Sequence, residues 1–292
     1  MPEIQARKIR MTLRRTTHLH ETTVSFDDRK INYAEGPDGG PPLLFIHGIS
    51  GRWQDWGSVV DDFADEWHVY AVDLRGHGKS SWVENGYHWR KYALDQVAFV
   101  EGVIRKPAVV VGHSLGGVTA LGLTSERPDL VRAVVYEDPP LFVHQRWEGN
   151  EFRNSFTATL EVLDTGPDFE TLVAHVKESN PILEDDRCRD RAEKLIAMDP
   201  DVFRSTLSGR SRSNWRVEDL LQSARSPGLL LQAEPSLGAA LFDDEAAKAM
   251  DLLPDAEYEK WDDSGHGMHS SFPDRFSERV QRFFKPYRNG RS

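Results

Sequence analysis

A serine stands between two glycines in the segment Gly112-His113-Ser114-Leu115-Gly116. The apolar residues 108–111 precede this segment with the pattern of a buried strand, and an apolar helical pattern follows it up to residue 126. A serine on a sharp strand-to-helix turn exposes its hydroxyl, and flanking glycines allow the strand and the helix to approach closely. The alternative is a helix-capping serine on an ordinary glycine-rich turn. The context favours Ser114 as a catalytic nucleophile.

A base must accompany this serine, because a serine hydroxyl is a poor nucleophile until a neighbouring imidazole takes its proton. Among the eleven histidines, His266 lies between two glycines in the loop that follows the last predicted strand, residues 258–261. A side chain in that loop can reach back over the edge of a sheet. We predict that His266 is the general base, and His269, three residues later, is the alternative.

Two further segments, residues 45–50 and 72–80, each follow a predicted buried strand. Their sequences are Phe45-Ile46-His47-Gly48-Ile49-Ser50 and Val72-Asp73-Leu74-Arg75-Gly76-His77-Gly78-Lys79-Ser80. Together with the serine turn and the histidine loop 263–267, they resemble the serine hydrolases of the α/β-hydrolase superfamily from about residue 21 to residue 284. The resemblance implies an α/β fold, a mostly parallel sheet with helices on both faces and an inserted helical lid. It also implies an oxyanion hole formed by the backbone N–H groups of Ile49 and Leu115.

The acidic member of the expected Ser-His-acid triad departs from the common family pattern. Its usual position, after the strand that follows the lid, is occupied by Ser236, which cannot stabilise an imidazolium as a carboxylate does. Asp138 lies 138 − 114 = 24 residues after the serine, and this offset resembles that of zearalenone lactonases and fluoroacetate dehalogenases. We therefore predict Asp138 as the acid, with Glu234 as the alternative and Glu137 as a third candidate.

Strand and helix patterns alternate over residues 21–140 and 227–286, which we expect to form the hydrolase core. Residues 141–226 contain helical patterns and no buried-strand run, so we expect the lid there. We predict that Trp147, Phe152 and Phe156 in this segment contact the substrate, because a lid over a sheet encloses an apolar pocket. The expected partner is therefore a small hydrophobic substrate.

The composition argues against several other classes of protein. The chain of 292 residues has 36 basic and 47 acidic residues, and the net charge of 36 − 47 = −11 disfavours nucleic-acid binding. No apolar run approaches the ~20 residues of a membrane span. The single cysteine, Cys188, excludes an intrachain disulfide and favours a reducing compartment, so we expect a cytoplasmic protein. Glycine-rich nucleotide motifs and metal-ligand spacings are absent from the sequence, and we predict no cofactor and no metal.

The first 20 residues are basic and lack the apolar stretch of a secretory signal, so we expect a disordered tail there. The sequence leaves the oligomeric state open, with a homodimer as one option.

These observations favour a carboxylic ester or lactone hydrolase that acts through a Ser-His-Asp triad and an acyl-enzyme. The first alternative is a hydrolase that cleaves a carbon–carbon bond in vinylogous diketones, although such relatives usually carry their acid at the position of Ser236. The second alternative is a ligand receptor that has the same fold and no enzymatic activity.

Overall fold

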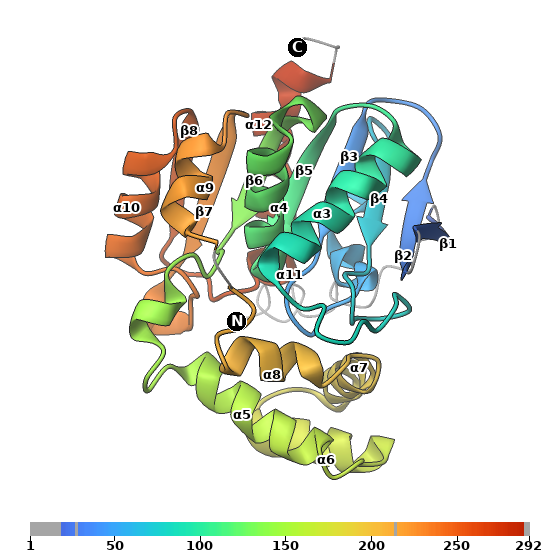
Figure 1. Ribbon diagram of the computed structural model, residues 1–292, viewed down its shortest axis with the longest axis vertical. Coiled ribbons are helices and arrows are strands. Elements are labelled where there is room, and N and C mark those ends of the chain that lie inside the picture. The colour runs from blue at the N-terminus through green and yellow to red at the C-terminus, as the bar shows by residue number, and fades with distance from the viewer. Residues whose placement is uncertain (1–18, 27–28, 213–214, 289–292) are drawn as a thin grey trace, which may run out of the picture.

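The structure of the protein is a computed structural model that describes residues 19–26, 29–212 and 215–288 (Figure 1). Of the basic segment 1–20, only the last two residues belong to the described part, so the expected disordered tail lies almost wholly outside it.

An eight-stranded sheet forms the centre of the described chain, in the order β1-β2-β4-β3-β5-β6-β7-β8. Strands β1 and β2 form an antiparallel hairpin, β2 pairs antiparallel with β4, and every pairing from β4 to β8 is parallel. The strands are β1 (His20–Phe26), β2 (Arg29–Gly36), β3 (Pro42–Ile46), β4 (His68–Val72), β5 (Ala108–His113), β6 (Val131–Glu137), β7 (Gly228–Ala233) and β8 (Ala256–Trp261). The predicted α/β class with a mostly parallel sheet is confirmed.

The central strands are buried on both faces, which explains why they read as continuous apolar runs. In β5, for example, Val110 packs into the core on one face of the sheet, whereas Val109 and Val111 pack into the core on the other. Strand β3 divides in the same way, with Leu44 on the first face and Phe45 on the second. Two hydrophobic cores therefore hold the helices against the sheet.

Helices cover both faces of the sheet. The first face carries α3 (Trp89–Phe99), which continues as the π-helix η3 (Val100–Ile104), together with α4 (Leu115–Glu126), α9 (Val217–Ser223) and α10 (Asp243–Leu252). Figure 1 shows these helices in front of the strands. The second face carries η2 (Trp53–Ser58), α2 (Asp61–Ala64), α11 (Met268–Ser271) and α12 (Pro273–Phe284). Short 3-10 turns connect the elements: η4 (Pro128–Leu130), η6 (Pro235–Leu237) and η7 (Lys285–Tyr287).

A separate group of helices lies beyond the sheet edge toward which the arrowheads of β4 and β6 point (Figure 1). It follows η5 (Val143–Arg146) and consists of α5 (Glu151–Leu163), α6 (Phe169–Ser179), α7 (Asp185–Ile196) and α8 (Asp201–Leu207). Helix α9 also falls within residues 141–226, but it packs against α4 and α10 on the sheet face. Helix α8 has only seven residues, and the sequence analysis did not identify it.

Among the described residues, no helix is both long enough and apolar enough to cross a membrane.

Candidate active site

Ser114 lies on the turn between β5 and α4, with φ 53° and ψ −117°. Residues other than glycine rarely adopt this backbone conformation. The two glycines around it are required by close backbone contacts. A Cβ atom on Gly112 would lie 2.2 Å from the carbonyl oxygen of Gly116, and one on Gly116 would lie 2.0 Å from that of Ile46. The turn therefore brings the first turn of α4 directly against the end of β3, with the serine between them.

His266 meets Asp138 at this edge of the sheet. The Nδ1 atom of His266 lies 2.6 Å from Oδ2 of Asp138, whose side chain is fully buried. Because a carboxylate only accepts hydrogen bonds, Nδ1 carries the proton and Nε2 keeps its lone pair. This is the tautomer in which an imidazole can take a proton from a serine hydroxyl.

Backbone N–H groups hold the carboxylate of Asp138 in place. Its Oδ2 accepts a hydrogen bond of 2.7 Å from the N–H of Ala240, and its Oδ1 accepts longer ones of 3.3 Å from the N–H groups of Ala233 and Leu241. These donors come from the end of β7 and the loop before α10. The segment that carries the acid in the common family pattern thus donates hydrogen bonds to an acid from the neighbouring strand β6.

Glu234, the alternative acid, is held away from His266. Its Oε1 accepts hydrogen bonds from the backbone N–H and the hydroxyl of Ser236, and its Oε2 lies 3.0 Å from Nζ of Lys260. The hydrogen bond from the Ser236 N–H and the ammonium group of Lys260 lower the pKa of Glu234 to about 2. The structure therefore brings Asp138, and not Glu234, to the imidazole.

The loop after β3 packs against the serine turn. A Cβ atom on Gly48 would lie 2.9 Å from Nδ1 of His113 and 3.0 Å from Cβ of Ser114, so a larger residue would force its neighbours to shift. His47 stabilises the loop, because its Nδ1–H donates to the Gly48 carbonyl at 2.7 Å and its Nε2 accepts from the N–H of Leu74 at 3.0 Å. Burial lowers the pKa of His47, which keeps the ring neutral in this arrangement.

Two backbone N–H groups beside the serine have no acceptor among the described residues: those of Ile49 and Leu115. Leu115 is the first residue of α4, so its N–H also lies at the positive end of the helix dipole. Both groups belong to segments that meet at Ser114. They can donate to a negatively charged oxygen that forms there.

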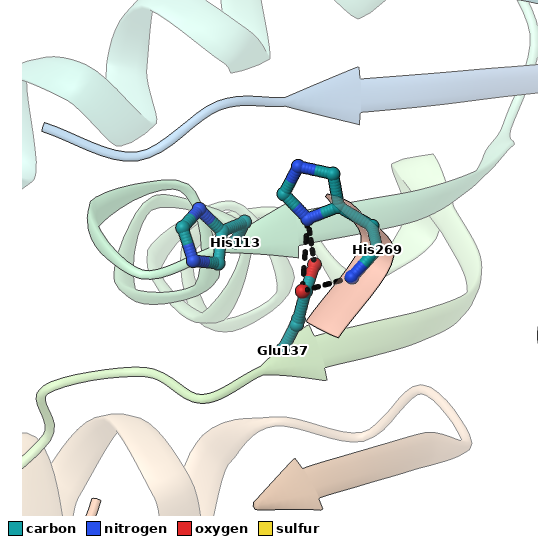
Figure 2. Close-up of side chains that lie close together, drawn as sticks. All are labelled: His113, Glu137 and His269. Atoms are coloured by element: carbon teal, nitrogen blue, oxygen red, sulfur yellow. Dashed lines mark hydrogen bonds and ion pairs between the residues drawn. The ribbon is translucent and has the colours of Figure 1, made fainter. Parts of the chain in front are cut away.

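Figure 2 shows a second pair of a histidine and a carboxylate, His269 and Glu137, together with His113. The Nδ1 of His269 is 2.8 Å and 2.9 Å from the two carboxylate oxygens of Glu137, which also accepts the backbone N–H of His269 at 2.9 Å. Burial would raise the pKa of Glu137, but His269 and His113 bring it below its ordinary value. The ring of His269 packs on Trp56, with centroids 4.4 Å apart.

His113 connects the two pairs. Its ring centroid is 4.6 Å from that of His266 and 5.0 Å from that of His269, and its Nε2–H donates to the His266 carbonyl at 3.0 Å. Burial lowers the pKa of His113 to about 3, so the ring is neutral. Sequence reasoning missed this network, although its signal was present: two consecutive acids, Glu137 and Asp138, and two histidines three residues apart.

The same three side chains, those of His113, Glu137 and His269, have potential metal-ligand atoms within 4.8 Å of one another. Internal hydrogen bonds already use both oxygens of Glu137, Nδ1 of His269 and Nε2 of His113. A metal ion would have to displace these bonds, so the donor set fits a hydrogen-bonded anchor better than a metal centre.

Of the three aromatic residues expected to contact the substrate, two lie near the histidine. The ring of Phe152 meets that of His266 edge-on, with centroids 5.1 Å apart, and Phe156 lies one helical turn further along α5. Phe156 stacks on Phe203 of α8 at 4.8 Å. Trp147 is half-buried, and no ring contact connects it to the site among the described residues.

Comparison with known proteins places the chain in a family. A family model described as "Alpha/beta hydrolase family" matches residues 43–279. The chain belongs to the alpha/beta hydrolase family. This membership confirms the family that the sequence motifs resembled.

Members of this family that resemble the chain include several hydrolases. A putative esterase/lipase of Haemophilus influenzae is 25% identical over 251 residues, which are 83% of each chain. The 2-(acetamidomethylene)succinate hydrolase of Mesorhizobium japonicum is 38% identical over 99 residues, or 34% of this chain and 36% of the relative. These relatives support a hydrolase.

Solved structures of the alpha/beta hydrolase family share the fold over most of the chain. Est816, described as an N-acyl homoserine lactone degrading enzyme, has a TM-score of 0.69 and 24% identity and covers 90% of this chain and 100% of its own. A putative aryl esterase from Burkholderia cenocepacia has a TM-score of 0.74 and 22% identity. The match covers 91% of this chain and 98% of the esterase.

Proposed function

We propose that this alpha/beta hydrolase cleaves a carboxylic ester or a lactone through an acyl-enzyme. The observation that carries the proposal is the contact between His266 and Asp138, because it leaves Nε2 of His266 free to act as a base. The strained turn that presents Ser114 supplies the nucleophile. In this proposal, Ser114, His266 and Asp138 form the triad.

The reaction follows from these groups. The Ser114 hydroxyl oxygen attacks the carbonyl carbon while Nε2 of His266 takes the hydroxyl proton. The oxygen of the former carbonyl becomes negatively charged and accepts hydrogen bonds from the N–H groups of Ile49 and Leu115. His266 then gives its proton to the departing alkoxide. The acyl group of the substrate remains bound to Ser114 as an ester. Water, activated by the same imidazole, hydrolyses this ester and restores the serine.

The helices beyond the sheet edge act as a lid in this proposal. Phe152 and Phe156 on α5 offer an apolar wall next to His266, which suits the hydrophobic part of a substrate. Trp147 is a weaker candidate for this wall, because no ring contact ties it to the site.

Carbon–carbon bond cleavage is a second candidate that uses the same groups, and a receptor without activity is a third. A panel of p-nitrophenyl esters, lactones and vinylogous diketones distinguishes the reactions from one another. A fluorophosphonate probe labels an activated serine and therefore distinguishes a serine hydrolase from a receptor.

The decisive variant is Ser114→Ala, which removes one hydroxyl and no packing. We expect labelling to disappear and ester turnover to fall to the ~10³–10⁴-fold over water that oxyanion stabilisation and binding alone provide. Circular dichroism should show an unchanged fold. Full turnover in a folded Ser114→Ala protein would rule out Ser114 as the nucleophile.

A further inference from the structure

One arginine of the lid, Arg191, lies beside the buried face of its helix. Helix α7 buries Cys188, Ala192 and Leu195, which form its inner face. Arg191 lies three residues after Cys188 and four before Leu195, so helical periodicity places it on the same face. Its side chain is nevertheless accessible to solvent, as a binding residue must be.

Arg191 lines a small cavity between the lid helices and the loop after β3. The cavity has a volume of about 30 Å³. Ser50, Thr159 and Asn180 contribute polar groups to its wall, and Phe156 contributes an apolar one. A space of this size admits on the order of two water-sized atoms, enough for the two oxygen atoms of a carboxylate.

No carboxylate of the protein pairs with Arg191 among the described residues. Its neighbours on α7 are paired: Asp190 and Glu193 bind Arg52, and Lys194 binds Asp55. Partial desolvation lowers the pKa of Arg191, and Cys188, not a carboxylate, is the group that opposes this effect. A guanidinium in the wall of a cavity, with no carboxylate of the described residues bound to it, is available to bind an anionic ligand.

The cavity adjoins the proposed active site on two sides. Ser50, on its wall, directly follows Ile49, whose N–H is a proposed oxyanion donor. Phe156, also on its wall, packs against Phe152, with centroids 6.2 Å apart, and Phe152 meets His266. A substrate attacked by Ser114 can therefore extend along this phenylalanine wall into the cavity.

We propose that Arg191 binds a carboxylate of the substrate at the end remote from the bond that is cleaved. This proposal rests on the ester or lactone hydrolase function and narrows its substrate class to compounds with an apolar middle and a terminal carboxylate. A guanidinium binds a carboxylate through two parallel N–H···O bonds. The hydroxyl of Ser50 can donate to a remaining lone pair of the carboxylate.

The test uses p-nitrophenyl esters of straight-chain dicarboxylic acids, with the second carboxyl either free or capped as a methyl ester. We expect the wild-type enzyme to prefer the free acid at the best chain length, and Arg191→Gln to lose about tenfold or more of kcat/KM on that ester alone. Arg191→Lys should be intermediate, because it keeps the charge and loses the planar fork. Arg189→Gln is the matched control, since Arg189 pairs with Glu170 on the outer surface.

The results separate this inference from the proposed function. Equal wild-type rates on free and capped esters, or an equal effect of Arg191→Gln on both, would overturn the inference while leaving ester hydrolysis intact. If neither ester is hydrolysed, the function fails, and calorimetry with straight-chain dicarboxylates then tests Arg191 directly. Binding that is lost in Arg191→Gln but kept in Arg189→Gln supports the subsite, and equal binding by all three proteins refutes it.

Discussion

Two neighbouring carboxylates at the end of β6 serve different histidines. Glu137 binds His269 within the core on the second face of the sheet, whereas Asp138 binds His266 at the proposed active site. Glu137 is the last residue of the strand, whereas Asp138 follows it with a positive φ of 42°, so the two adjacent acids can reach two separate partners. We propose that the Asp138 pair is catalytic and the Glu137 pair structural, and each role can be tested.

The choice of the acid predicts a contrast between two amide variants. Asp138→Asn keeps the shape of the side chain but can hold the imidazole of His266 in the wrong tautomer, so kcat should fall by up to about 10⁴-fold. Glu234→Gln should be close to wild type in kcat, because Glu234 contacts Ser236 and Lys260 instead of the histidine. Steady-state kinetics on one ester measures both. The reverse result would place the acid after β7.

Alanine variants of His266 and His269 should differ in activity and in stability. His266→Ala should abolish turnover with little loss of stability, since it removes the base. His269→Ala leaves the buried carboxylate of Glu137 without its partner, so the free energy of unfolding should fall by about 3–5 kcal/mol, with measurable turnover in the fraction that folds. Urea unfolding measures the stability of each variant, and the turnover rate divided by the amount of folded protein measures its activity. A stable but inactive His269→Ala protein would show that the wrong histidine was chosen.

At the scale of elements, the active site depends on close approaches between backbones. The end of β3, the end of β5 and the start of α4 meet where glycines allow contacts that a Cβ atom would block. Helix α7 is attached differently, by ion pairs with the region of η2, such as Lys194 with Asp55 at 2.6 Å. Close backbone contacts therefore fix the serine turn, and ion pairs between side chains hold α7 in place.

The serine turn predicts a difference between two glycine variants. Gly112→Ala places a methyl group 2.2 Å from a backbone oxygen that cannot move away, so the free energy of unfolding should fall by about 3 kcal/mol or more. Gly149→Ala is the control: its φ of 75° is strained for alanine, but nothing lies within 4 Å, so the loss should be about 1 kcal/mol. Urea unfolding measures both. Similar losses would mean that backbone strain, and not the close contact, accounts for the glycine at 112.

At the scale of the whole molecule, the fold buries neutral histidines. Burial lowers the pKa values of His77 and His113 to about 3, whereas the unfolded chain titrates near the ordinary value of 6.5. Between these limits the unfolded chain binds protons that the native state does not. Stability therefore decreases as the pH falls from about 6.5 toward 3.

Replacing one of these buried histidines should make the free energy of unfolding depend less steeply on pH. The free energy of unfolding of the wild-type protein should decrease between pH 6.5 and pH 5, and in His113→Asn the slope should be smaller by about 1 kcal/mol per pH unit. Because slopes are compared, a general loss of stability in the variant does not matter. His20→Asn, at an exposed position, should keep the wild-type slope. An unchanged slope in His113→Asn would mean that His113 titrates in the native state.

Much of this architecture could be predicted from local patterns. The strand β5, the helix α4 and the glycines around Ser114 are near neighbours in the chain, and their apolar periodicity and backbone freedom are local properties. The same holds for the other central strands, β3, β4, β6 and β7, whose apolar runs reflect burial on both faces. The short helix α8 was missed because seven residues carry too little periodicity to detect.

Only the tertiary structure decided which carboxylate meets His266. Asp138 and Glu234 both follow strands that end at the same edge of the sheet, so sequence position could not separate them. The choice depends on contacts between distant segments: three backbone N–H groups hold Asp138 from residues 233–241, and Lys260 of β8 holds Glu234. The place of Arg191 in the wall of a cavity, with no carboxylate partner among the described residues, likewise depends on which distant groups surround it in space.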